Sequence, residues 1–140
     1  MKRQISLVYI LAISIGIIYL WFGMLKFFPN VSPAEELAKN TIDLLTFHLI
    51  PSNISIILLA TWESLVGLFL ILNIWRRTTV VIAIIHIIFT FSPIFLLTEQ
   101  VFSDTPFQLS LVGQYIIKNL IIIVCLFLLY RAPANKFKLQ

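Results

Sequence analysis

Three ionisable residues stand inside otherwise apolar stretches of this sequence. Glu63 lies in "ATWESLVG", His86 in a run of isoleucines and Lys118 in "GQYIIKNLI". An ionised side chain in hydrocarbon costs roughly 3 kcal/mol on insertion scales, so such groups are usually paired and turned toward protein. A carboxylate, an imidazole and an ammonium group can bind a polar ligand or transfer a proton. These three residues are therefore the first candidates for a functional site.

The composition around them is that of an integral membrane protein. The 140 residues are 60% hydrophobic and 11% charged, with a mean hydropathy of +1.02. The net charge of +4 does not indicate nucleic-acid binding, because the basic residues gather at the chain ends and in one short loop. The single cysteine, Cys125, and the lack of a second histidine within a span predict no metal site, bis-histidine haem or iron–sulfur cluster.

Four stretches are long and apolar enough to cross a bilayer, which requires about 20 residues each. They cover approximately residues 5–27, 54–74, 78–97 and 109–130. We therefore expect an all-α membrane protein, a four-transmembrane-helix bundle that forms a single domain over residues 1–140.

The basic residues predict the orientation of the spans. They precede the first span, separate the second from the third and follow the fourth, at Lys2, Arg3, Arg76, Arg77, Arg131, Lys136 and Lys138. By the positive-inside rule both termini are cytoplasmic. The sequence thus predicts a multi-pass protein of the cytoplasmic (inner) membrane of a bacterium.

The first outer loop contains the pattern of a short amphipathic helix over residues 33–48. In "SPAEELAKNTIDLL", Ser32 and Glu35 have the spacing of a capping box, and Glu35 and Lys39 form an i,i+4 pair. Small and apolar residues share another face: Ala34, Leu37, Ala38, Thr41 and Leu45. We expect this helix to lie at the outer surface and cap the bundle.

Polar residues align along one face of every span when each is drawn as a helix. This alignment predicts a polar cleft inside an aliphatic coat. The candidate ligand-binding or buried polar residues are Tyr19, Lys26, Glu63, His86, Gln114, Tyr115, Lys118 and Asn119.

The predicted depth of Lys118 in the membrane indicates Glu63 as its partner. Glu63 and Lys118 each lie about nine residues, or ~14 Å, below the outer end of their predicted helices, so we expect them to form a buried ion pair. The pair either locks two helices in register or binds a ligand or proton, and the sequence leaves both open. His86 lies near the same depth, and Lys26 lies at the outer mouth, where it either lines the cleft or snorkels to the interface.

The strings "YLWFGMLKFFPNVSPAEELA", "WESLVGLFLIL" and "LSLVGQYIIKNLIII" resemble the DoxX-like family of small four-helix membrane proteins. The resemblance covers nearly the whole chain. It rests on Gly23 and Lys26, on Glu63 within its span, and on the string from Gly113 to Asn119. The family is named after a subunit associated with thiosulfate:quinone oxidoreductase, and animal relatives are assembly factors. The resemblance implies that Lys26, Glu63 and Lys118 form a shared polar site.

Three functions are consistent with these features, and whether the chain is an enzyme stays open. The first is an accessory subunit of a membrane redox system that binds a quinone or another lipophile in the cleft. The second is a non-catalytic assembly or binding partner of another membrane protein. The third is a proton-coupled transporter acting as an oligomer. The expected partners are the lipid bilayer and a membrane subunit or a second copy of the chain.

Overall fold

The computed structural model describes residues 2–105 and 107–133, with side chains described from residue 7 onward. Seven helices occur within these residues, and an isolated antiparallel bridge joins Phe102 to Leu109. The helices are α1 (Lys2–Leu25), α2 (Glu35–Leu45), α3 (Ser52–Ile71), α4 (Arg76–Phe89), α5 (Pro93–Leu96), α6 (Thr98–Val101) and α7 (Leu111–Arg131).

Four segments in the described part of the chain are long and apolar enough to cross a membrane. They are Leu7–Leu25, Ser52–Ile71, Arg76–Leu96 and Leu111–Arg131. The predicted four-helix membrane bundle is confirmed, and the chain is a multi-pass membrane protein. The third span is interrupted, since α4 ends at Phe89 and α5 starts at Pro93. The interruption is explained by Pro93, because proline has no backbone N–H to donate within a helix.

Glycines allow α1 and α3 to pack closely. A Cβ atom added at Gly67 would clash with the backbone of Leu20 and Gly16 on α1. A Cβ at Gly23 would lie 2.7 Å from the backbone nitrogen of Ser64 on α3. Small residues at these crossings replace side-chain contacts by close backbone packing, as is common between membrane helices.

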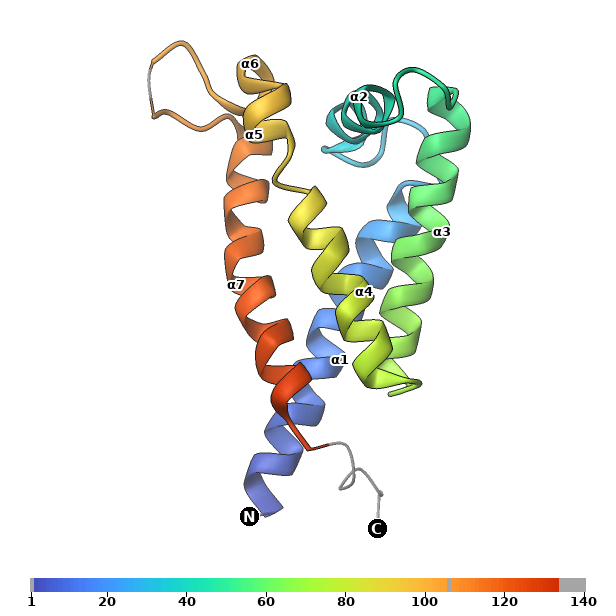
Figure 1. The fold of residues 1–140 in the computed structure, drawn as a ribbon, viewed down its shortest axis with the longest axis vertical. Helices are drawn as coiled ribbons and strands as arrows, with labels where there is room; N and C mark the ends of the chain where they lie inside the picture. Colours follow the sequence, from blue (N-terminus) through green and yellow to red (C-terminus); the bar gives the residue numbers. More distant parts are fainter. Residues whose placement is uncertain (1, 106, 134–140) are drawn as a thin grey trace.

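The second pair of spans, α4 and α7, is tied together at the end of the bundle where both described chain ends lie (Figure 1). Arg76 begins α4 and is only 6% exposed. Its guanidinium donates a hydrogen bond of 2.6 Å to the carbonyl of Ala132, the residue that caps α7. Above this bond, fully buried Val80, Leu126 and Leu129 belong to the main apolar core.

Helix α2 lies across the opposite end of the bundle, where it faces the ends of the spans (Figure 1). It is shorter than the predicted segment 33–48. Its apolar face turns inward, with Leu37 and Thr41 buried. The helix therefore covers that end of the bundle, as expected from its pattern.

The predicted capping box is wrong. The helix is capped at Ala34 without a side-chain hydrogen bond, and the Ser32 hydroxyl is buried without a partner. The Glu35 carboxylate instead accepts hydrogen bonds from the Lys39 ammonium at 2.6 Å and the Asn30 backbone N–H at 2.7 Å. These bonds, that of Lys39 above all, hold the pKa of Glu35 below its usual range although burial opposes the shift.

Candidate functional site

A cavity of about 590 Å³ lies between α1, α2, α3, α4 and α7. Its volume falls in the range of small-molecule sites, which are mainly apolar with a few convergent polar groups. Most of its walls are aliphatic and aromatic. The polar side chains that line it are Tyr19, Lys26, Ser32, Thr41, Glu63, His86, Thr90, Tyr115, Lys118 and Asn119.

An ion pair between Lys26 and Glu63 forms one wall of this cavity. The Lys26 ammonium lies 2.6 Å from Oε2 of Glu63, and each residue is only 8% exposed. The ammonium also donates to the Phe22 carbonyl at 3.4 Å. The pair joins α1 to α3 beside Gly23, where a Cβ would come within 3.0 Å of the Glu63 Cβ. Close packing at this glycine thus brings the two charges together.

The predicted ion pair between Glu63 and Lys118 is therefore wrong. Helix α3 begins at Ser52, so Glu63 lies eleven residues, or ~17 Å, along it, whereas Lys118 lies seven residues, or ~11 Å, from Leu111 at the start of α7. The Glu63 carboxylate is instead held by Lys26 and faces His86. Both line the cavity, but from different helices on its two sides.

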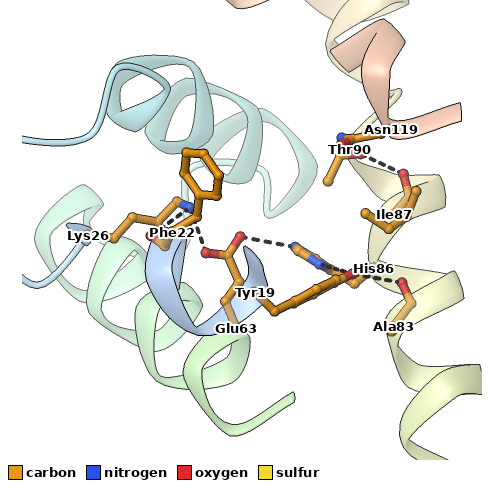
Figure 2. Close-up of polar contacts among 9 residues, drawn as sticks. All are labelled: Tyr19, Phe22, Lys26, Glu63, Ala83, His86, Ile87, Thr90 and Asn119. Carbon is orange, nitrogen blue, oxygen red and sulfur yellow. Dashed lines mark hydrogen bonds and ion pairs between the residues drawn. The ribbon is translucent and has the colours of Figure 1, made fainter. Parts of the chain in front are cut away.

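His86 extends the polar wall from α3 to α4 (Figure 2). Its Nε2 lies 3.6 Å from Oε1 of Glu63, and its Nδ1 lies 3.3 Å from the Tyr19 hydroxyl. The Tyr19 hydroxyl donates to the carbonyl of Ala83 at 3.2 Å. A continuous polar chain thus runs from Lys26 through Glu63 and His86 to Tyr19.

The contact between His86 and Glu63 can hold one exchangeable proton. When the Tyr19 hydroxyl donates to the Ala83 carbonyl, its contact with His86 requires the hydrogen to be on His86 Nδ1. In the neutral imidazole Nε2 is then an acceptor, and it faces a second acceptor, the Glu63 carboxylate. A proton placed on either His86 or Glu63 makes this contact attractive, so the two groups can accept and return a proton.

A second polar contact lies between α4 and α7. The Asn119 amide donates to the Thr90 hydroxyl at 2.9 Å, and that hydroxyl donates to the Ile87 carbonyl at 2.6 Å (Figure 2). All three residues line the cavity. The bond holds the two helices together where α4 ends.

Tyr115 and Lys118, which both line the cavity, make aromatic contacts. The Tyr115 ring packs against Phe22 on α1 in an edge-to-face arrangement, with 6.5 Å between ring centroids. The Lys118 ammonium lies over the Tyr115 ring, 5.4 Å from its centroid, within reach of a cation–π interaction. Lys118 is therefore in contact with an aromatic ring where the sequence predicted a carboxylate.

Seven of the eight residues proposed from the sequence line the cavity. The exception is Gln114, which is exposed and lies outside the lining. The proposed set omitted Thr90 and Phe22, which line the cavity with the others. Their spacing gave a signal, since Thr90 follows His86 by four residues and Phe22 follows Tyr19 by three, which places each pair on one helix face.

Within the part of the chain that the structure describes, no three histidine, cysteine, aspartate or glutamate residues gather as metal ligands. Comparisons with protein-family models, curated proteins and solved structures find no match for this chain.

Proposed function

We propose that this chain is a DoxX-like membrane protein that binds a lipophilic molecule with a polar head, as an accessory subunit of a membrane redox system. One observation carries the proposal: a mainly apolar cavity of about 590 Å³ contains a polar wall of Lys26, Glu63 and His86. An ion pair needed only to join two helices would not require a cavity beside it. The resemblance of the sequence to DoxX-like proteins supports the redox setting.

A quinone fits the chemistry of this wall. Its carbonyl oxygens are acceptors. The Lys26 ammonium is a donor that lines the cavity, and His86 is a second donor when it holds the proton shared with Glu63. The apolar walls suit the ring and its tail. When bound, the quinone supplies the electron chemistry. Glu63 and His86 would hold or return one of the two protons that accompany its two-electron reduction by the partner redox subunit, because one exchangeable proton fits between them.

Quinone binding can be measured with the purified protein in maltoside detergent and a short-chain ubiquinone analogue, by isothermal titration calorimetry. We expect His86→Phe to weaken binding about tenfold or more because it removes a donor. Glu63→Gln should have a similar effect because it removes the carboxylate that holds Lys26 and faces His86. Glu99→Gln is the matched control, because Glu99 is exposed on α6 and outside the cavity lining. Unchanged binding in both cavity variants, with the fold retained by circular dichroism, refutes the proposal.

The proposed location is the cytoplasmic membrane of a bacterium, with both termini in the cytoplasm. Support comes from the basic residues at the starts of α1 and α4 and the end of α7, which lie toward the same end of the bundle (Figure 1). A cysteine placed at Glu99 in a Cys125→Ser background should react with an impermeant maleimide on intact cells. A cysteine at Arg77 should react only after permeabilisation, and the reverse pattern contradicts the orientation.

The second candidate function is a binding partner in membrane-protein assembly. It is favoured by α7, whose spanning window is 17% buried, against 28–33% for the other three spans. Its exposed apolar face includes Leu120, Ile121, Val124 and Leu128. Val124→Trp should then reduce co-purification of a stoichiometric membrane subunit, while Leu58→Trp on the exposed face of α3 should not. Equal recovery with both variants counts against this function.

A further inference from the structure

The charges that line the cavity do not cancel. Lys26 and Glu63 neutralise each other at 2.6 Å. Lys118 lines the same cavity, and no carboxylate among the described residues forms an ion pair with it. With His86 neutral, the lining holds two lysines and one glutamate, and therefore an excess of one positive charge.

Tyr115 positions this excess charge without neutralising it. Its ring lies beneath the Lys118 ammonium at 5.4 Å and is itself supported by Phe22 of α1. The ring attracts a cation through its quadrupole but carries no net charge. Lys118 lies ~11 Å along α7 from its start at Leu111 and is exposed in the structure. In a bilayer its ammonium would therefore lack a protein carboxylate at a depth where an uncompensated charge is costly.

The apolar walls of the cavity suit a hydrocarbon chain. Ile122 lies one turn further along α7 and lines the cavity, and Ile18 and Leu59 line it from α1 and α3. A ligand that compensates Lys118 must combine an anionic group with an apolar body that these residues can cover. A neutral quinone satisfies the apolar walls but leaves the charge of Lys118 without a counterion.

We infer that the preferred ligand of this cavity is an amphiphile with one anionic head group, a carboxylate or a phosphate on a hydrocarbon chain, whose charge pairs with Lys118. The inference rests on the proposed role of the cavity as a lipophile site and specifies its ligand class. Pairing is favoured because an ion pair is strong where water is scarce, and because charge-assisted hydrogen bonds from an ammonium to such oxygens are short and strong.

The test compares amphiphiles that share a chain and differ in head group. Oleate supplies a carboxylate, oleoyl lysophosphatidic acid a phosphate, and oleyl alcohol a neutral head. Apparent affinities come from thermal-shift titrations of the maltoside-solubilised full chain at equal mole fractions of amphiphile. We expect at least one anionic amphiphile to bind about tenfold tighter than oleyl alcohol, or about 1.4 kcal/mol. The carboxylate and phosphate arms show which head group is the source of the preference.

Three variants assign that preference to Lys118. Lys118→Met should abolish the difference between anionic and neutral amphiphiles, and Lys118→Arg should retain it. Arg77→Met removes an exposed cation at the other end of the bundle and should leave the preference unchanged. If Lys118→Met unfolds the chain, Lys118→Gln in the same titrations decides the question.

Equal binding of oleate, lysophosphatidic acid and oleyl alcohol to the wild-type protein overturns the inference, as does a preference that survives loss of Lys118. In either case binding of the short-chain quinone still supports the proposed function. If neither the quinone nor any amphiphile binds, the proposed function and the inference both fail.

Discussion

Lys26, the residue that follows α1, and Glu63 of α3 form an ion pair, with the ammonium 2.6 Å from the carboxylate, at a point where Gly23 brings the two helices into close contact. The pair joins neighbouring spans, so it can stabilise their packing. It also leaves one carboxylate oxygen of Glu63 facing His86 and the cavity. The same two residues thus contribute to the fold and to the candidate site.

Loss of Lys26 should destabilise the bundle strongly. Lys26→Met leaves Glu63 buried without its partner, which we expect to cost about 3–5 kcal/mol in the free energy of unfolding. Unfolding by SDS titration in mixed micelles measures the change. Lys26→Met combined with Glu63→Gln should recover much of the loss, because no buried charge is then left without a partner.

A double-mutant cycle of Lys118 and Glu63 serves as the control for the cycle of Lys26 and Glu63. Lys118→Met and Glu63→Gln should be additive within about 0.5 kcal/mol, as expected for residues without a shared contact. A larger coupling energy for Lys118 and Glu63 than for Lys26 and Glu63 contradicts the pairing described above.

Even a methyl side chain at position 67 should destabilise the bundle. In an ordinary helix Gly→Ala is favourable by about 1 kcal/mol, but here the Cβ would meet the backbone of Leu20 and Gly16. We expect Gly67→Ala to destabilise the bundle by about 1–3 kcal/mol, the usual cost of overpacking. Leu65→Phe adds volume on the exposed face of the same helix and should have little effect. A Gly67→Ala protein as stable as wild type rules out this close contact.

Arg76 should hold the end of α7 in place. Its guanidinium donates to the Ala132 carbonyl, and a charged hydrogen bond contributes about 1.5–3 kcal/mol. Arg76→Leu should therefore speed amide hydrogen exchange in the last turn of α7. The neighbouring Arg77 is exposed, so Arg77→Leu should leave those exchange rates unchanged. Equal exchange in both variants means that the bond does not hold the helix end.

The spans were predictable because hydropathy can be read along the chain, whereas the ion pair depended on which helices are neighbours. The prediction paired Glu63 with Lys118 from depth alone. The positions of the glycines would have indicated which helices are neighbours. Gly23 lies one turn before Lys26, and Gly67 lies one turn after Glu63. Each charge thus has a glycine beside it on a surface that can approach another backbone closely. Matching the two glycine faces would have selected α1 as the partner of α3.

Local competition explains the failed capping box. The pattern of Ser32 and Glu35 ignores that Lys39 is also in reach of the Glu35 carboxylate, and the loop before α2 brings the Asn30 amide to it as well. Charge-assisted bonds of this kind are stronger than a neutral cap. The position of a loop amide depends on the folded loop, so this partner could not be read from spacing.

These bonds at Glu35 predict how the cover of the cavity responds to acid. The pKa of Glu35 is lowered in the folded chain, so the stabilisation is complete above the unfolded value, about 4.3, and is lost as the pH falls through the folded value. Acidification through this window should loosen α2 and increase its proteolysis or hydrogen exchange. Glu35→Gln should remove this pH dependence, whereas Glu36→Gln, at the exposed neighbouring residue, should retain it. Since Leu37 and Thr41 of α2 line the cavity, a ligand bound there should slow the loosening. If ligand leaves the exchange of α2 unchanged, α2 does not cover the occupied site.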